Sequence, residues 1–180
     1  MRTETKVIGG IALATIVILV GSIWLLTAQS TKEQTKLSKP LVGEEIADQG
    51  RGHVPDGTQV QYNSNPPTSG QHYIKWITRG IYDKPQVDGN LVHSLEHGAV
   101  IVSYKSDLSK EDVEKIKSVF GSTSVSKKIM VPRDNLDVPI ALTSWGRLLK
   151  LQIIDATSEA KIKEFMETNK DRGPEKGASL

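Results

Sequence analysis

The chain has 180 residues, a length that suits one ordinary domain and an appendage. Its net charge is only +2, and basic residues do not interleave with aromatic ones, so we expect no nucleic-acid partner. The chain has no cysteine, which excludes disulfides, thiolate catalysis and cysteine-ligated zinc or iron–sulfur clusters. Any metal site must therefore use other ligands.

The longest uncharged run is VIGGIALATIVILVGSIWLLTA, over residues 7–28. About 20 apolar residues cover the ~30 Å hydrocarbon core of a bilayer, and Trp24 lies near the far end, where aromatic rings favour the interface. A cleaved signal peptide is the alternative, although its apolar region is roughly 7–15 residues long. The run predicts a single-pass protein of the cell membrane, with a short cytoplasmic N-terminus over 1–6, a transmembrane helix over 7–28 and an extracytoplasmic C-terminal domain.

The next two stretches carry few regular patterns. Residues 29–46 are polar, with few large apolar side chains, and predict a linker. Residues 47–98 are rich in Gly, Pro, Asn and Asp, and only residues 58–62 (TQVQY) alternate like a strand. Side chains that seek burial, such as Tyr73 and Trp76, argue against disorder here. We therefore expect a long ordered loop region.

Regular elements are clearer after residue 98. The run AVIVSY over 99–104 predicts a central strand. Ser109 predicts the N-cap of a helix, and Gly121 its end. Further strands are expected over 128–131, 140–145 and 148–154, followed by a last helix that opens at Ser158 and stops at Gly173-Pro174. The order β-α-β-β-β-α predicts an α+β domain over 47–175, with a small mixed or antiparallel sheet, two helices packed on it and the long loop region in front.

The groups that could carry chemistry are the four histidines, His53, His72, His93 and His97, which all lie in the loop region. Metal sites need several convergent nitrogen ligands. The spacing of four between the last two places both imidazoles on the same side of a helix or of a strand. The alternative is a polar hydrogen-bond network that fixes the long loop onto the sheet. Spacing alone leaves both interpretations open.

Residues 93–97 also match the pattern H-x-x-E-H, the inverted zinc-protease motif, in which Glu96 would be the general base. That motif needs a long helix and a further ligand far downstream. Here Gly98 ends any helix after about two turns, and a strand-like run begins at once. We therefore discount the protease interpretation.

At these residues the chain resembles a bacterial family known only as a domain of unknown function, DUF3105. The shared blocks read Gly52-His53, Tyr62-Asn-Ser-Asn-Pro-Pro-Thr-Ser-Gly-Gln-His72, Gly80-Ile-Tyr82, Leu91-Val-His-Ser-Leu-Glu-His-Gly98, Ala141-Leu-Thr-Ser-Trp-Gly146 and Gly173-Pro-Glu175. They cover about residues 46–175, and Gln71 stands where Pro is usual, which loosens the turn before His72. The resemblance implies an N-terminal membrane segment and implies that all four histidines belong to the family pattern. It brings no established activity, cofactor or substrate.

We therefore predict a metal-binding domain. The predicted ligands are His53, His72, His93 and His97. Neutral imidazoles suit Zn²⁺ or Cu²⁺, and Glu96 would orient a ligand, or act as the base of a metal-dependent enzyme if the coordination sphere is open. The other alternative is a metal-free domain that binds a protein partner, which the sequence does not identify, or an envelope polymer. It predicts separated histidines and an exposed surface over Trp76–Tyr82.

Overall fold

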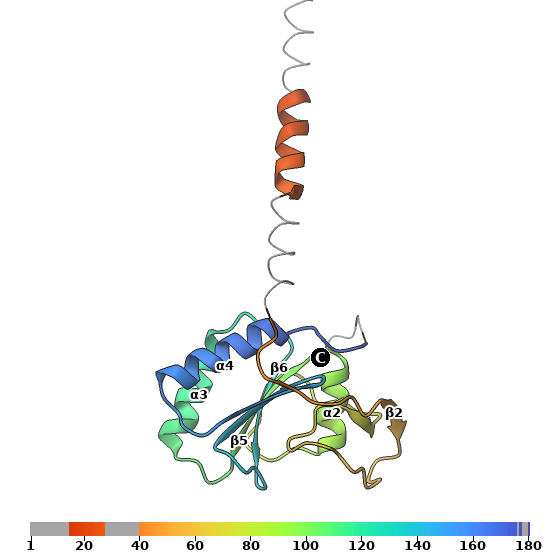
Figure 1. Ribbon diagram of the computed structural model, residues 1–180, viewed down its shortest axis with the longest axis vertical. Coiled ribbons are helices and arrows are strands. Elements are labelled where there is room, and N and C mark those ends of the chain that lie inside the picture. Colours follow the sequence, from red (N-terminus) through yellow and green to blue (C-terminus); the bar gives the residue numbers. More distant parts are fainter. Residues whose placement is uncertain (1–14, 28–39, 176, 178–179) are drawn as a thin grey trace, which may run out of the picture. The chain divides into compact units, whose positions relative to one another are not determined.

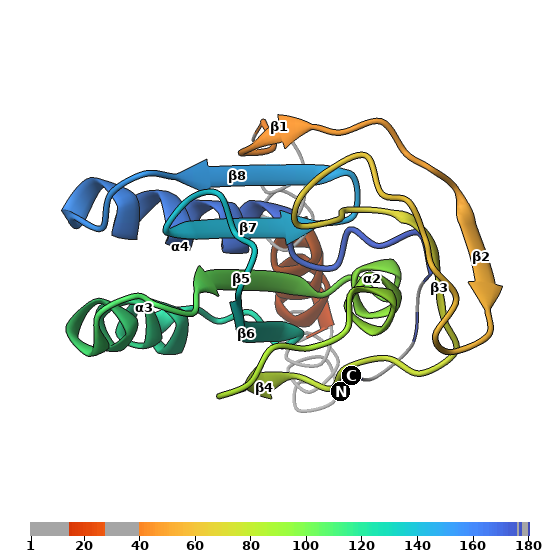
Figure 2. The ribbon, with the colours of Figure 1, turned by 90° about the horizontal axis from the view of Figure 1, so that it is seen from below.

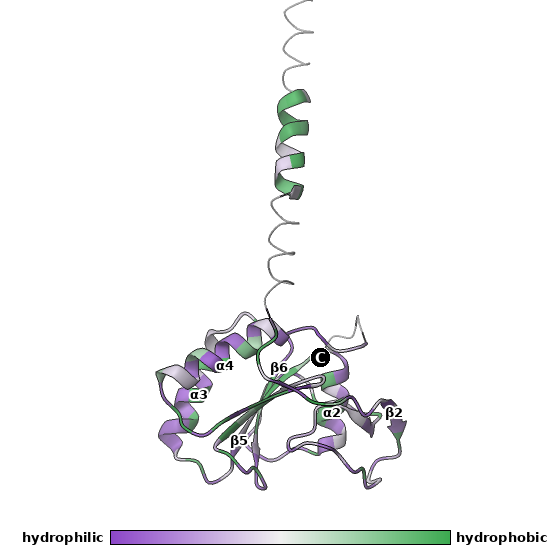
Figure 3. Cartoon of the chain, in the orientation of Figure 1, coloured by the Kyte–Doolittle hydropathy of each residue, from purple (hydrophilic) through white to green (hydrophobic). Residues whose placement is uncertain are grey.

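The computed structural model describes residues 15–27, 40–175, 177 and 180 (Figure 1). The chain divides into two compact units, Met1–Pro40 and Leu41–Leu180. Apart from Pro40, the described part of the first unit is a helix over residues 15–27, which is hydrophobic along most of its length (Figure 3).

The N-terminal helix corrects the prediction of a membrane span. No helix among the described residues is long and apolar enough to cross a membrane. The described helical residues, 15–27, cover about 20 Å at 1.5 Å per residue. The predicted transmembrane helix over 7–28, and the single-pass membrane location that depended on it, are therefore contradicted. Residues 1–14 and 28–39, which carry the rest of the predicted span and most of the predicted linker, lie outside the described part.

The second unit is built on a six-stranded mixed sheet with the order β1-β8-β7-β5-β6-β4 (Figure 2). Its strands are β1 (Glu44–Glu45), β4 (Gly80–Ile81), β5 (Val100–Lys105), β6 (Lys128–Arg133), β7 (Ile140–Ser144) and β8 (Arg147–Leu151). Strand β5 lies inside the sheet, parallel to β6 and antiparallel to β7. The predicted central strand and the α+β class with a mixed sheet are thus confirmed. Strand β1 lies in the stretch for which the sequence predicts a linker.

Helices cover both faces of the sheet: α2 (Asp88–Glu96), α3 (Lys110–Ser122) and α4 (Ala156–Asn169). Because side chains alternate along a strand, β5 packs on both sides. Val100 and Val102 join the core that includes Phe165 of α4, while Ile101 joins Leu91 and Leu95 of α2. Figure 1 shows α3 and α4 on one side of β5, and α2 with β2 on the other. Two helices were predicted on the sheet, and the third, α2, is the one that the sequence did not indicate.

The helix ends agree only in part with their predicted signals. Ser109 is the N-cap of α3 and accepts a hydrogen bond from the Asp112 N–H at 3.1 Å, as predicted. Gly121 lies inside α3 and does not end it. Helix α4 begins before the predicted Ser158. Its N-cap is Asp155, whose carboxylate accepts a hydrogen bond from the Ser158 N–H at 2.8 Å.

The predicted loop region holds more regular structure than its composition indicates. Besides β4 and α2 it contains β2 (Arg51–Val54) and β3 (Gly70–Tyr73), which form a separate two-stranded parallel sheet. Residues 58–62, predicted as a strand, adopt no regular structure. Residues 66–70, which lead into β3 and include its first residue, are buried instead.

Helix α2 is fixed at both ends. At its start, the Asp88 carboxylate accepts from the Arg133 guanidinium of β6, with one N–O distance of 2.9 Å. At its end, the C-terminal segment packs against the backbone, and a Cβ added at Gly173 would lie 2.1 Å from the Glu96 carbonyl oxygen. The Glu175 N–H donates to that same oxygen at 3.1 Å. These contacts set the position of the helix from which two of the candidate ligands project.

Candidate metal centre

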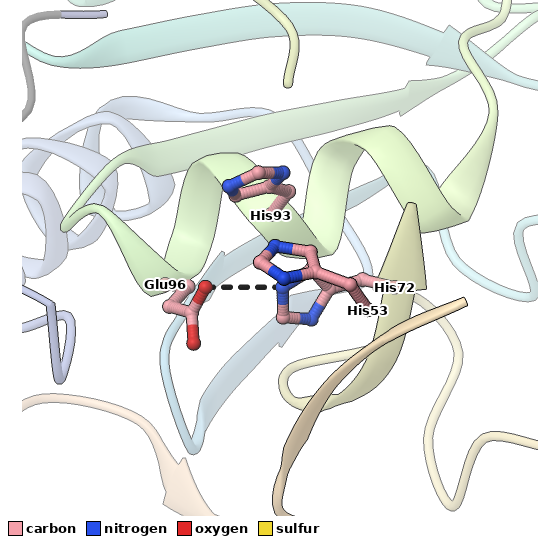
Figure 4. Close-up of side chains that lie close together, drawn as sticks. All are labelled: His53, His72, His93 and Glu96. Carbon is pink, nitrogen blue, oxygen red and sulfur yellow. Dashed lines mark hydrogen bonds and ion pairs between the residues drawn. The ribbon is translucent and has the colours of Figure 1, made fainter. Parts of the chain in front are cut away.

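Three elements bring ionisable side chains together on the α2 side of the molecule. His53 projects from β2, His72 from β3, and His93 and Glu96 from α2. Each offers one ligand atom, and these four atoms all lie within 4.8 Å of one another. Figure 4 shows the three imidazoles and the carboxylate pointing toward a common centre.

Local geometry explains the convergence. In the parallel pair of β2 and β3, His53 lies directly opposite His72, so both side chains leave the same face of the small sheet. On α2, a spacing of three places His93 and Glu96 on one face. His97 follows as the C-cap of the helix, and Gly98, at φ +86°, ends it in a conformation that favours glycine.

All four predicted histidines meet in the structure. The ring centroids of His53, His72 and His93 lie 4.8–4.9 Å apart, and those of His93 and His97 lie 4.7 Å apart. The group whose ligand atoms are mutually close nevertheless contains Glu96 and not His97. The sequence assigned Glu96 the role of an orienting group or base. Its spacing from His93 is the signal that could have placed it among the ligands, once a helix was expected there.

Two of the imidazoles are held by backbone carbonyls. The Nδ1 atom of His72 lies 2.8 Å from the Gly70 carbonyl oxygen, and Nδ1 of His93 lies 2.8 Å from that of Tyr73. A carbonyl oxygen only accepts, so in both rings Nδ1 carries the hydrogen and donates it. In the neutral ring the Nε2 atom then keeps its lone pair. Both lone pairs are directed into the cluster, the arrangement that metal-ligating histidines commonly show.

The carboxylate of Glu96 faces one of these lone pairs. Its Oε2 atom lies 3.0 Å from Nε2 of His72, and both side chains are almost completely buried. A carboxylate and an unprotonated ring nitrogen are both acceptors, so the contact needs a positive centre between them. A proton on His72 or a bound cation would each supply it. Without one, two buried acceptors would face each other at considerable cost in free energy.

The ring of His97 contains a buried nitrogen without a hydrogen-bond partner in the described part of the chain. Its Nε2 atom lies 2.9 Å from Nε2 of His93, which keeps a lone pair, so the His97 ring donates to it. That leaves Nδ1 of His97 unprotonated and buried, with no hydrogen-bond partner in the described part of the chain. Buried polar atoms without partners are uncommon in folded proteins, and ions or water often satisfy them.

Burial favours the neutral form of the His93 ring. Desolvation is the largest influence and lowers the pKa of His93 from its ordinary value of 6.5. The bond to the Tyr73 carbonyl raises the pKa, because the charged ring is the stronger donor, while the neighbouring imidazoles lower it further. The net shift is downward, so this ring takes up a proton less readily than an exposed histidine.

Two tryptophans border the cluster. The Trp76 ring lies 5.3 Å from both His93 and His97, nearly perpendicular to each, and the residue is 41% exposed. The Trp145 ring lies 6.5 Å from that of His72. The exposed Trp76 agrees with the prediction for a metal-free domain, but the clustered histidines do not agree with its prediction that they are separated.

Comparison with known proteins identifies the family but not the chemistry. The family model described as "Protein of unknown function (DUF3105)" matches residues 53–180, which include every residue of the cluster. No curated protein and no solved structure matches the chain. The resemblance noted from the sequence is therefore confirmed, and the chain belongs to the DUF3105 family.

Proposed function

We propose that the domain binds one divalent transition-metal ion, Zn²⁺ or Cu²⁺, through the imidazoles of His53, His72 and His93 and the carboxylate of Glu96. Three nitrogens and one oxygen form a set that both ions accept. The Glu96 oxygen takes the place predicted for His97. The ring of His97 donates to Nε2 of His93 in the metal-free chain, so an ion that binds His93 would require His97 to release that lone pair.

The observation that carries this proposal is the pair of carbonyl-held rings. With Nδ1 of His72 and His93 committed to backbone carbonyls, both Nε2 lone pairs converge beside a buried carboxylate. A cation would satisfy Nε2 of His72 and the carboxylate together, and it would take the Nε2 lone pair of His93 once His97 stops donating to it. A proton would satisfy only the contact between His72 and Glu96.

The spacing of the ligand atoms is compatible with one ion. Atoms bonded to zinc at ~2.0–2.1 Å lie at most about 4.2 Å apart, whereas the four here spread over as much as 4.8 Å. Small side-chain rotations would therefore complete the coordination. A full set of four protein ligands closes a tetrahedral sphere and favours binding over hydrolysis, in which one position stays open to water.

Metal analysis of the full-length chain tests the proposal. After incubation with zinc or copper and gel filtration, the wild-type chain should retain one ion per chain. The His72→Ala and His93→Ala variants should retain almost none, while circular dichroism confirms that they are folded. An exposed substitution on α3, Lys110→Ala, serves as the control and should retain the full amount. Equal metal content in the wild type and in both histidine variants would reject the proposal.

A further inference from the structure

The four proposed ligands differ sharply in exposure. His72 is 0% exposed, and His93 and Glu96 are each 4% exposed. His53 is exposed to solvent. An ion bound by this set would therefore have three ligands inside the protein and one at the surface.

His53 is also the least restrained of the four. Its ring contacts those of His72 and His93, but no hydrogen bond reaches it from the described residues. Its strand, β2, pairs with β3 and with no other described strand, and alternate residues of β2 are exposed. In contrast, the rings of His72 and His93 are each fixed at Nδ1 by a carbonyl oxygen.

We propose that His53 is an exchangeable ligand through which the metal is handed over to an acceptor. The inference rests on the proposed metal binding and adds the route by which the ion would leave the site. An incoming imidazole or thiolate group would reach the ion at the surface, form a bond to it and displace the His53 nitrogen. The bond from the metal to His53 breaks as the bond to the incoming group forms, and the freed imidazole is released to solvent. Further ligand atoms of the acceptor then replace His72, His93 and Glu96 one after another, and no electrons are transferred at any step.

The other boundary of the cluster disfavours the same exchange. The Trp76 indole lies against His93 and His97, and the carboxylate of Glu96 is enclosed next to His72. An acceptor would have to displace these packed side chains before it met a buried ligand. Exchange at His53 needs only the rotation of an exposed ring. A site with this asymmetry suits the transfer of a metal better than its permanent retention.

Stopped-flow measurements on the zinc-loaded full-length chain test the handover. The chromophoric chelator 4-(2-pyridylazo)resorcinol acts as the acceptor, at increasing concentrations. For exchange at an exposed ligand, the rate of zinc removal should rise in proportion to the chelator concentration. A rate that is independent of chelator concentration would show that zinc leaves before the acceptor binds, and would overturn the inference.

The His53→Ala variant assigns that exchange to one residue. It should still bind one zinc through the three buried ligands, but release it at least about tenfold faster, in line with the weakening that loss of a supporting group causes. Millimolar imidazole, which can occupy the vacated position, should slow the release again. Arg51→Ala, an exposed change on the same strand, should behave like the wild type.

The outcomes separate the two proposals. A wild-type chain that binds no zinc rejects the metal site itself. A His53→Ala variant that releases zinc at the wild-type rate, or that binds none at all, rejects only the handover, since His53 would then be either irrelevant or as essential as the buried ligands. Failure of imidazole to slow the release from His53→Ala would count against it in the same way.

Discussion

The two faces of the central sheet are completed by different chemistry. Toward α3 and α4, the sheet presents side chains such as Val102 and Ile140, which pack with Phe165 into an apolar core. Toward α2, an apolar contact through Leu95 is followed by a polar layer of imidazoles and a buried carboxylate. The first face is satisfied by burial alone. The second contains acceptors that face one another, which a proton on His72 or the proposed cation would satisfy.

The largest effect is expected from removing a carbonyl-held ligand. His72→Ala deletes one of the two fixed lone pairs and leaves Glu96 buried without its partner. Metal affinity should fall by well over the ~10–100-fold that loss of an outer-shell partner causes. Isothermal titration with zinc measures the change. An affinity within a few-fold of the wild type would show that His72 is not a ligand.

Truncating a core side chain on the opposite face should lower the stability of the fold and leave the zinc affinity unchanged. Phe165 is completely buried in the apolar core, so Phe165→Ala should lower the free energy of unfolding by about 3–5 kcal/mol. Urea unfolding of the metal-free chain measures this loss. Folded Phe165→Ala protein should bind zinc as tightly as the wild type. A large loss of zinc affinity in Phe165→Ala would mean that the two faces of the sheet depend on each other, contrary to the contrast drawn between them.

Exchanging the carboxylate for an amide separates metal binding from folding. In Glu96→Gln, the new NH₂ group can donate to the Nε2 lone pair of His72, so the metal-free fold should be as stable as the wild type or more stable. Zinc affinity should nevertheless fall by roughly 10–100-fold, because a charged ligand is lost. Paired urea unfolding and zinc titration measure the two effects. A large loss of metal-free stability would indicate that Glu96 is mainly a structural ion-pair partner.

The polar face should also respond to pH. The folded chain holds the pKa of His93 below its unfolded value, so the unfolded chain takes up this proton first as the pH falls. Metal-free stability should be full above pH ~6.5 and decline as the pH drops through the lowered pKa. His93→Asn should decline less between pH ~7 and ~5. Urea unfolding at several pH values compares the two, and equal slopes would refute the contribution of His93.

The smallest effect should come from a helix cap on the apolar side. Ser109→Ala removes the side chain that accepts from the Asp112 N–H, and it should cost about 1 kcal/mol in stability. Zinc binding should stay unchanged, because α3 contributes no group to the cluster. Thermal unfolding combined with zinc titration provides the check.

The apolar half of the fold was predictable because its signals are local. The continuous apolar, β-branched run over residues 99–104 and the cap at Ser109 indicate a strand and a helix from neighbouring residues alone. The cluster was only partly predictable. The spacing of His93 and His97 indicates a shared side, but the meeting of His53 with His72 depends on a parallel pairing of two short strands whose sequences carry no periodic signal.

Two further features escaped prediction for definable reasons. Helix α2 is short, and apolar residues such as Leu91 and Leu95 bury it although glycine and asparagine near its start disfavour a helix. Tertiary contact thus overrides local propensity there. The uncharged run over 7–28 gave the opposite error: its hydropathy predicts a span, but no helix among the described residues is long and apolar enough to cross a membrane.

Long-range proton–nitrogen NMR of the histidine rings tests the central claim most directly. In the full-length chain, Nδ1 of both His72 and His93 should carry a hydrogen at neutral pH, as their carbonyl partners require. On addition of one equivalent of zinc, their Nε2 resonances should shift together with one ring nitrogen of His53. Nε2–H tautomers at His72 and His93, or ring nitrogens that do not respond to zinc, would contradict the account.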